Sequence, residues 1–388
     1  MTLTYPSAGS QMPRRRGGSS WLRTYDLPLL ACALALSLIG ALLVWSATKG
    51  KLIGFENDPE AYLKKHIINL VIGMALGLLV SRFDYRLLRA YTPILYVASI
   101  FGLIVVLSPL GSTINGAKAW ISLPGGFTLQ PSEFAKIAII LGMAMILSEK
   151  RDAENEPRDI DVLYALGVAG VPMALVMLQP DLGTVMVTAC AVFGIIAVSG
   201  AKARWLVGIL AGGALVAFVA IQVGILQQYQ LDRLTAFADP TANPRGIGYN
   251  TQQARIAIGS GGLFGTGLFE GPQTQGRFVP YNQTDFVYSV AGEELGFAGA
   301  VGIIALFAVL LWRAVRIAVR ASDLFGRLVA TGVACWIGFQ AFENIGMNLG
   351  IMPVTGVPLP FVSYGGTSMF ASWIAVGLLL NVHLRSQE

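Results

Sequence analysis

Residues 277–311 read RFVPYNQTDFVYSVAGEELGFAGAVGIIALFAVLL, a polar segment followed by a long apolar run. The run begins at Phe286 and is long enough to cross a bilayer core as a helix, which takes about 20 residues. Asp285 therefore lies at the predicted boundary between water and hydrocarbon, immediately before a helix. A carboxylate in that position stays partly hydrated and anionic while it meets a substrate anchored in lipid. We predict that Asp285 carries the chemistry of this protein.

The composition extends this interpretation to the whole chain. Hydrophobic residues make up 54% of the 388 and charged residues only 13%, whereas soluble domains carry about 25% charged residues. The mean hydropathy is +0.63. The sequence therefore predicts an all-α integral membrane protein with about ten transmembrane helices. The expected spans are 27–46, 66–81, 90–108, 132–148, 162–179, 182–199, 205–226, 286–311, 328–348 and 367–383.

The cysteine, histidine and charge content argue against other kinds of site. The three cysteines lie apart from one another in apolar runs, which is typical of small core residues rather than of a disulfide or metal cluster. Only two histidines are present, so a histidine-based metal site is not expected. The net charge of +5 comes mostly from short loops between apolar runs, so we expect no nucleic-acid partner.

The distribution of Lys and Arg predicts the orientation in the membrane. With the N-terminus in the cytoplasm, 17 of the 27 Lys and Arg lie on the cytoplasmic side and nine on the other. Both termini are therefore expected to be cytoplasmic, and the loop at about 227–285 is expected to face outward.

That outward loop is too long for a simple connection and carries apolar and aromatic residues throughout. We interpret it as a structured extracellular cap between spans seven and eight. Residues 1–20, which include Arg14, Arg15 and Arg16, predict a disordered basic cytoplasmic tail. Residues 21–388 are expected to form a single polytopic membrane domain.

Polar residues predicted at membrane depth are candidates for function, because burying them is costly. Glu133 and Lys136 share one face of the fourth predicted span. They form either a structural ion pair between helices or a pair that orients substrate, and the sequence leaves both interpretations open. Lys118 and Trp120 lie just upstream at the outer interface, where a tryptophan is also typical of the ordinary aromatic belt.

Glycine and arginine residues in the cap suggest an anion site. Residues 252–258 are expected to form a short amphipathic helix, and GSGGLFG follows at 259–265. The backbone amides of such a cluster can point at one anion, although a plain glycine-rich turn is the alternative. Because Arg255, Arg233 and Arg245 are near in sequence, a pyrophosphate site is a reasonable hypothesis.

Three further features complete the pattern. Asp181 is expected to cap the helix that follows it. Residues 352–366 contain three prolines between two spans, so we expect them to re-enter the bundle and to form the floor of an outward-facing cavity. Glu293, Glu294 and Glu343 are interpreted as interhelical hydrogen-bonding residues.

Five motifs, taken together, resemble one family. They are QPSEFAK at 130–136, QPDLGT at 179–184, IAIGSGG at 256–262, TDF with GEELG within 284–296, and PLPFVSYGG at 358–366. In content and order they are similar to the SEDS family of RodA, FtsW and the sporulation homologue, which are ten-span peptidoglycan glycosyltransferases. Residues 273–275, 278–280 and 352–356 look more like RodA than FtsW. The chain departs from the family pattern at Ala119, Asn250, Gln283 and Thr367, which affects substrate contacts more than chemistry.

The resemblance implies roles for particular residues. Asp285 matches the catalytic aspartate, Glu133 with Lys136 matches an essential intramembrane pair, and Trp120 matches a tryptophan needed for function. Gln253 and Arg255 match cap residues near the site. The predicted substrate-binding residues are Lys118, Trp120, Glu133, Lys136, Arg233, Gln253, Arg255 and Thr284.

The resemblance also implies a reaction and partners. The expected function is polymerisation of lipid II into glycan strands outside the bacterial cytoplasmic membrane, for cell elongation and rod shape, with Asp285 as general base. The substrates are lipid II and glycan linked to undecaprenyl pyrophosphate, both held among membrane lipids, and the expected protein partner is a class B penicillin-binding protein.

The negative charge on the leaving pyrophosphate is expected to be stabilised by Arg255, Lys136, Lys118 or a bound Mg²⁺ or Mn²⁺. No metal-ligand cluster is visible in the sequence, so a metal requirement stays open. A lipid II flippase and a non-catalytic scaffold of a cell-wall complex are the alternative functions.

Overall fold

The structure is a computed structural model of the chain, and it describes residues 25–49, 60–83, 85–114, 117–149, 157–224, 228–238 and 246–387. The predicted tail, 1–20, lies outside the described residues. Helices make up most of the described chain. In order they are α1 (Leu27–Thr48), α2 (Ala61–Arg82), α3 (Tyr85–Leu107), α4 (Pro131–Leu147), α5 (Asp159–Leu178), α6 (Leu182–Val198), α7 (Ala203–Val223), α8 (Gln228–Ala238), α9 (Ile247–Ser260), α10 (Pro272–Gln275), α11 (Val287–Glu294), α12 (Gly296–Arg320), α13 (Leu324–Leu349) and α14 (Gly366–Arg385).

The helices form one membrane-type bundle. Among the described residues, eight helices are long and apolar enough to cross a membrane, namely α1, α2, α3, α5, α7, α12, α13 and α14. Two shorter helices of 17 residues, α4 and α6, pack in the same bundle. The predicted all-α membrane class is therefore confirmed.

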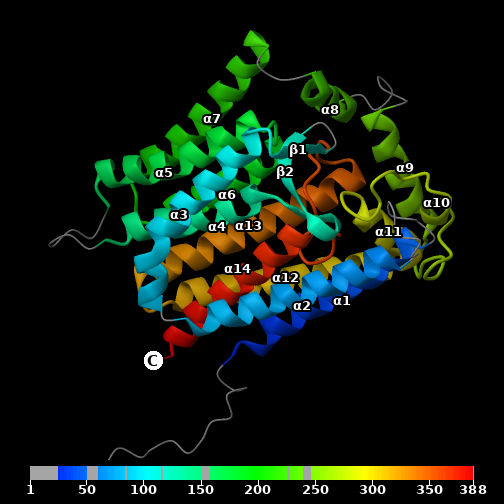
Figure 1. The fold of residues 1–388 in the computed structure, drawn as a ribbon, viewed down its shortest axis with the longest axis horizontal. Helices are drawn as coiled ribbons and strands as arrows, with labels where there is room; N and C mark the ends of the chain where they lie inside the picture. The colour runs from blue at the N-terminus through cyan, green and yellow to red at the C-terminus, as the bar shows by residue number, and fades with distance from the viewer. Residues whose placement is uncertain are drawn as a thin grey trace, which may run out of the picture.

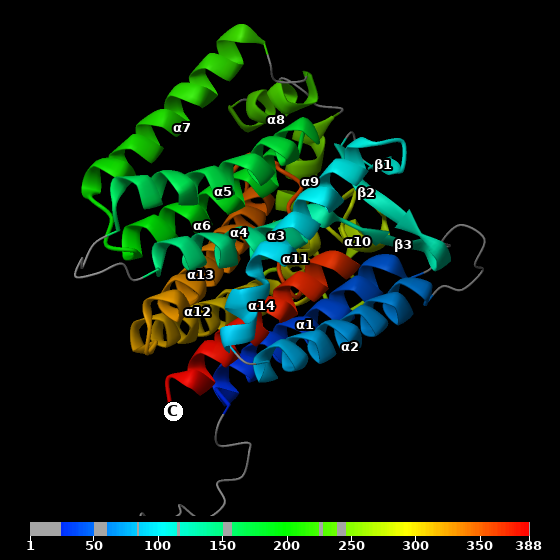
Figure 2. The same cartoon turned by 60° about the vertical axis from the view of Figure 1, so that its left-hand side comes forward.

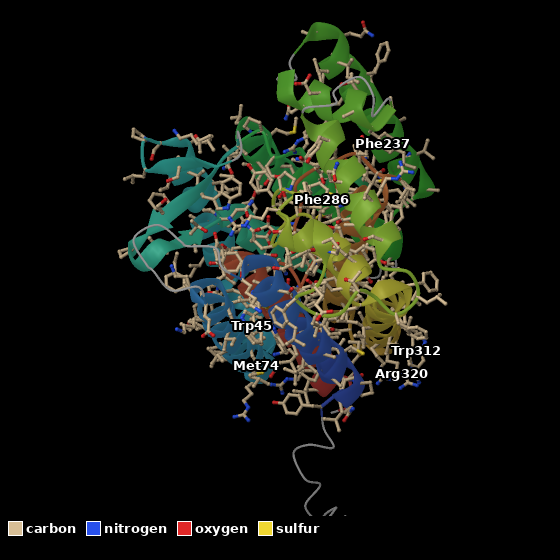
Figure 3. The ribbon with its side chains drawn as sticks, turned by 90° about the vertical axis from the view of Figure 1, so that its right-hand side faces the viewer. Trp45, Met74, Phe237, Phe286, Trp312 and Arg320 are labelled. Carbon is tan, nitrogen blue, oxygen red and sulfur yellow. The ribbon has the colours of Figure 1, made fainter. Side chains whose placement is uncertain are left out.

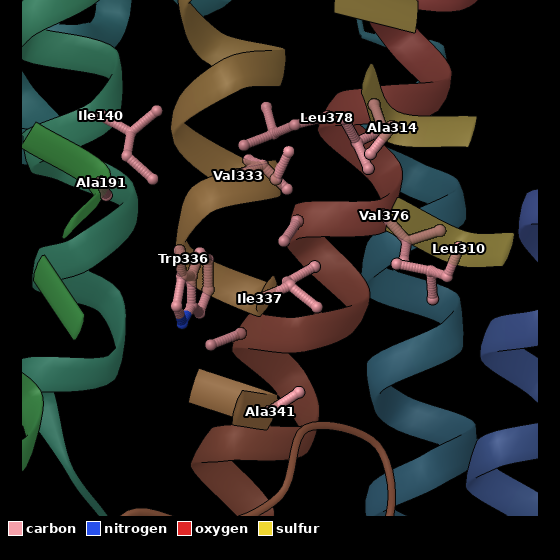
Figure 4. Close-up of a cluster of buried hydrophobic side chains, with 14 of the residues drawn as sticks. Ile140, Ala191, Leu310, Ala314, Val333, Trp336, Ile337, Ala341, Val376 and Leu378 are labelled. Carbon is pink, nitrogen blue, oxygen red and sulfur yellow. The ribbon is translucent and has the colours of Figure 1, made fainter. Parts of the chain in front are cut away.

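The centre of the bundle is α13, which contacts α4, α6, α12 and α14. Its residues Val333, Trp336 and Ile337 are all buried. Figure 4 shows them with Ile140 and Ala191 on one side and α14 on the other. Because α13 packs against four other helices of the bundle, most of its residues are buried, and it carries the polar side chains described below into the centre of the bundle.

A small sheet departs from the purely helical expectation. Three antiparallel strands, β1 (Gly111–Ile114), β2 (Ala117–Leu123) and β3 (Phe127–Leu129), pair in sequence order between α3 and α4. The strands are too short to give a clear alternating pattern in a chain dominated by long apolar runs. The sheet lies at the same end of the bundle as α9 and α10 (Figures 1 and 2).

The predicted single span over 286–311 is wrong in detail, because the chain divides it into α11 and α12 at Gly296. Gly296 has φ +67, a left-handed conformation that favours glycine. A Cβ atom there would lie 2.2 Å from the amide nitrogen of Gly265. The glycine-rich loop after α9 thus crosses directly over the break, which hydropathy alone does not show.

The two ends of the bundle differ. One end carries the sheet with α9 and α10, and the C-terminus lies at the other (Figure 1). In Figure 3, Phe237 and Phe286 lie toward the first end and Trp312 and Arg320 toward the second. We call the first end, with β1–β3 and α8–α10, the cap end. Of the long helices, α7 stands apart, with no buried residue among those described.

Candidate active site

The turn that holds Asp285 is fixed by side chains from elsewhere in the bundle. The backbone carbonyl of Asp285 accepts hydrogen bonds from the side-chain amides of Asn344 and Asn348, each at 3.0 Å. The carbonyl of Thr284 accepts one from the Ser363 hydroxyl at 2.6 Å. A buried backbone carbonyl needs such partners, so the turn before α11 is held rigidly at the cap end of α13.

The same α13 amides hold the proline-rich segment between α13 and α14. Asn344 also donates to the carbonyl of Val357 at 2.8 Å, and Gln340 donates to that of Pro358 at 2.8 Å. Val357 and its neighbours are mostly buried, and the segment is not helical. The predicted re-entry of 352–366 into the bundle is confirmed, because side-chain amides satisfy the backbone groups that a helix would otherwise satisfy.

The carboxylate of Asp285 lies beside the guanidinium of Arg233, which comes from α8 in the cap. A Cβ atom on Gly356 would be 3.6 Å from both Asp285 Oδ2 and Arg233 Nη2. Arg233 is held there because its Nη1 donates to the carbonyl of Thr355 at 2.7 Å. Both charged groups therefore lie against Gly356, which has no side chain to fill the space next to them.

This environment changes the acidity of Asp285, which is half-buried in the turn outside the helices. Burial raises the pKa of its carboxyl from 3.8 to about 6, against the charge of Arg233 and a hydrogen bond with Thr284, which both lower it. A carboxylate with a pKa near the working pH is suited to accept a proton.

A small pocket adjoins Arg233. Arg233, Phe237, Thr251, Arg255, Met352 and Val354 are among the residues that line it. Its volume of about 20 Å³ admits about one water molecule. Arg255 is exposed on α9, and Gln253 is half-buried on the same helix. The structure therefore places Arg233 beside Asp285 and Thr284, and it places Arg255 with Arg233 in the adjoining pocket, with Gln253 on the same helix as Arg255.

Glu133 and Lys136 lie away from that pocket in a buried network. Lys136 Nζ donates to Glu133 Oε1 at 2.9 Å and to Gln340 Oε1 at 3.0 Å, and it lies 4.6 Å from the ring centroid of Trp336. The two charged side chains are 2% and 1% exposed. Because Gln340 also binds Pro358, the pair supports the proline-rich segment, which favours the structural interpretation of the two that the sequence left open.

Lys118 and Trp120 both lie on β2, outside the Asp285 turn. Lys118 Nζ donates to the carbonyl of Leu107 at 3.1 Å, at the C-terminal end of α3. A cation at that position satisfies a free helix carbonyl and complements the helix dipole. Trp120 is half-buried.

The glycine-rich loop at 259–265 packs against α11 and does not form an open anion site. A Cβ atom on Gly261 would lie 2.0 Å from the carbonyl oxygen of Gly292. The amides of Gly265 and Thr266 already donate to the carbonyls of Gly261 and Glu293. The glycine-rich-turn interpretation is therefore favoured over a pyrophosphate nest, and Arg245 lies outside the described residues.

The acidic residues Glu293, Glu294 and Asp181 hold helix ends and helix contacts through hydrogen bonds. Glu293 accepts hydrogen bonds from the amides of Gln273 and Thr274, at 2.6 and 2.9 Å, which caps α10. Because Glu293 is on α11 and its donors are on α10, its predicted interhelical hydrogen bonding is confirmed. Glu294 also bonds to another helix, because it accepts from Ser46 of α1. Asp181 accepts from the amide of Thr184 at 3.0 Å, so its predicted capping role is confirmed.

Sequence reasoning missed the polar stripe of α13. Gln340, Asn344 and Asn348 recur every four residues, which places them on one face of the helix. All three side chains are buried. Amides at this spacing in an apolar span were the signal that could have identified them.

The chain belongs to the FtsW/RodA/SpoVE family. The family model, described as cell cycle protein, matches residues 26–388. The chain is 38% identical over 362 residues to the probable peptidoglycan glycosyltransferase FtsW of Trichlorobacter lovleyi, with 93% of each protein covered. It is 39% identical to the stage V sporulation protein E of Bacillus subtilis, with 92% of this chain and 96% of that protein covered.

Solved structures share the fold as well. One comes from a study titled as the structural coordination of polymerization and crosslinking by a peptidoglycan synthase complex. It has a TM-score of 0.77 and 32% identity, and covers 94% of this chain and 99% of the other. The rod shape determining protein RodA of Thermus thermophilus has a TM-score of 0.68 and 31% identity, with 95% and 100% covered.

Proposed function

We propose that this chain is a peptidoglycan glycosyltransferase that polymerises lipid II on the outer side of the bacterial cytoplasmic membrane, with Asp285 as general base. The names of the relatives support the reaction class. The observation that carries the residue assignment is the position of Asp285 beside Arg233 at the cap end, in a turn fixed by Asn344 and Asn348. A raised pKa, a nearby cation and a rigid backbone are the properties that a positioned base requires.

The chemistry follows from those groups. The C4 hydroxyl of the acceptor sugar attacks C1 of the donor sugar, so the new C1–O4 bond forms as the bond from C1 to the diphosphate breaks. Asp285 takes the hydroxyl proton, and the negative charge leaves on undecaprenyl pyrophosphate. Arg233 lies beside Asp285, and Arg255 lines the adjoining pocket with Arg233, so these two cations are assigned to the leaving diphosphate. Lys136 binds Glu133 and Lys118 binds the end of α3, so both are already engaged elsewhere.

The size of the pocket adds a condition. A pocket of about 20 Å³ is far too small for two sugars. We infer that α8 and α9 move away from the 350–354 segment when substrates bind. Gly350, Met352 and Val354 line one wall of the pocket, and Arg233 and Arg255 line the other. Cross-linking α9 to this segment is expected to stop turnover while the folded protein persists.

The direct test is polymerisation of lipid II by the purified protein, with and without divalent cation. We expect Asp285→Ala to abolish glycan strands and Asp285→Asn to reduce them at least about 100-fold. Asp159→Ala is the matched control, because that exposed carboxylate pairs with Arg204 and Lys202 at the start of α5. Strands of normal yield from folded Asp285→Ala protein would refute the assignment of the base.

The alternatives predict different outcomes. A flippase would move fluorescent lipid II across liposomes without making polymer. A non-catalytic scaffold would tolerate Asp285 substitutions as long as its partner still binds. We propose a class B penicillin-binding protein as that partner, and the solved relative from a peptidoglycan synthase complex supports an assembly of this kind.

We assign the activity to cell elongation, because residues 273–275, 278–280 and 352–356 resemble RodA. Cell division is the second candidate, because the curated relatives include proteins named FtsW. Depletion of the protein in its host distinguishes these roles. Rounded cells support elongation, and filaments support division.

A further inference from the structure

The start of α14 lies directly beside the Asp285 turn and faces α2. The amide of Tyr364 donates to the carbonyl of Gln283 at 2.9 Å, which joins the two segments. Residues Tyr364, Gly365 and Gly366 are half-buried, and α14 begins without a side-chain cap at Gly365. The first amides of a helix without a cap are donors that need an acceptor.

Two polar side chains of α2 are buried at this point and carry atoms without a hydrogen-bond partner. Asn69 is 3% exposed and His66 is 0% exposed. In the part of the chain that the structure describes, Asn69 Oδ1 and both ring nitrogens of His66 have no hydrogen-bond partner. The Asn69 amide faces α14, because its Nδ2 and Oδ1 lie 3.2 Å from a Cβ atom built on Gly366.

Unpartnered groups of this kind are rare in folded proteins, because each one costs free energy. Two of them one helical turn apart, against one uncapped helix start, indicate a missing polar ligand. Aromatic rings flank the place. The ring of His66 stacks on Tyr364 with centroids 6.2 Å apart, and Tyr62 meets Tyr364 edge-on at 5.0 Å.

The donors and acceptors determine which chemistry fits. The helix amides and Asn69 Nδ2 are donors, whereas Asn69 Oδ1 is an acceptor that needs an N–H or O–H group. A phosphate anion supplies acceptors only, and it would be repelled by Oδ1. A secondary amide supplies both, because its carbonyl accepts from the donors and its N–H donates to Asn69 Oδ1. Aromatic rings beside it suit the apolar face of a sugar.

We propose that the start of α14, with Asn69 and His66 of α2, binds the acetamido group of an N-acetylated sugar on the lipid-linked substrate. This inference rests on the proposed function, since it concerns a head group that Asp285 would act on. The site is joined to the catalytic turn through Tyr364, whereas Arg233 lies beside Asp285 in the same turn. Sugar and diphosphate are thereby recognised by different residues next to the reacting atoms.

The test measures binding of two lipids to the full chain in nanodiscs. Lipid II carries the sugars, and undecaprenyl pyrophosphate carries only the diphosphate. Asn69→Leu is expected to weaken lipid II binding about threefold to tenfold, the value of one or two uncharged hydrogen bonds. It is expected to leave the affinity for undecaprenyl pyrophosphate within about twofold.

A second variant keeps the test valid if Asn69→Leu does not fold. Gly365→Ala adds a methyl group at the helix start where φ is 171 and the nearest atom, Ser368 Cβ, is 3.7 Å away. This variant is expected to fold and to bind lipid II more weakly, with little change in its affinity for undecaprenyl pyrophosphate. Gly170→Ala, a site with nothing within 4 Å, is the control. If a variant loses the same affinity for both lipids, or loses affinity for neither, the proposal is overturned.

Combining the binding measurement with a polymerisation assay separates this proposal from the catalytic one. If the wild type binds lipid II with the expected sugar selectivity but makes no polymer, the proposed function fails and the sugar site stands. If it makes polymer and Asn69→Leu leaves both the KM for lipid II and its affinity unchanged, the sugar site fails alone.

Discussion

Replacing Asp285 by asparagine is expected to make the protein more stable while it removes activity. Burial raises the pKa of this carboxyl from its ordinary 3.8 to about 6, and each pH unit corresponds to about 1.4 kcal/mol between the two protonation states. The full difference is about 3 kcal/mol. Because Asp285 is half-buried and solvent screens part of this energy, we expect about 1–3 kcal/mol at pH 8.

The sign follows from the direction of the pKa change. The folded state binds the proton more tightly than the unfolded chain, so this group favours folding below about pH 4. That contribution is lost as the pH rises through about 6, when the buried carboxyl becomes charged. Asparagine stays neutral, so the stability gain of Asp285→Asn should be absent at pH 4 and complete near pH 8.

The assay is thermal unfolding of wild type and Asp285→Asn in the same detergent at a series of pH values. Activity of the wild type should rise over the pH range in which its stability falls, because both follow deprotonation of Asp285. An unfolding midpoint for Asp285→Asn that exceeds the wild type equally at every pH, or at none, would refute this reasoning. An increase that is the same at every pH would indicate a packing effect. No increase at any pH would indicate that the carboxyl of Asp285 is well hydrated.

Three further outcomes follow from the contacts. Arg233→Ala should move the acid limb of the pH–rate profile to higher pH, because Arg233 lowers the pKa of Asp285; an unmoved limb would contradict the pairing. Gly296→Ala should destabilise the protein by at least about 1–3 kcal/mol, measured as the unfolding midpoint, while Gly302→Ala, which meets nothing within 4 Å, should have little effect. Glu293→Gln should cost about 1–3 kcal/mol and speed hydrogen exchange at 273–275, since α10 loses its cap; unchanged exchange would argue against that role.

The fold class could be predicted from the sequence because long apolar runs identify the segments that can cross a bilayer. Some helix caps could also be predicted, because a capping residue and the helix that it caps are neighbours in the sequence. Asp181 precedes an apolar run at a distance that suits a helix cap, and it caps α6. The break at Gly296 was not accessible, because the residues on both sides are apolar. Its cause is the close approach of Gly265, which comes from another segment.

The roles of the buried charges depended on neighbours that hydropathy does not reveal. Glu133 and Lys136 were placed correctly on one helix face, yet their contact with Gln340 decides that they support the proline-rich segment. The amide side chains of α13 recur every four residues, so their shared helix face could have been predicted from the sequence. Nothing in the sequence indicates that they bind the carbonyls of Asp285 and Val357.

By itself, the sequence determined that this is a helical membrane protein and that Asp285 sits where an apolar run begins, because both properties depend on the order of polar and apolar residues along one segment. Only the tertiary structure decided that Arg233 faces Asp285 and that Asn69 meets the start of α14. Those contacts join segments far apart in the chain, and they are set by how whole helices pack against one another. No local pattern encodes the distance between them.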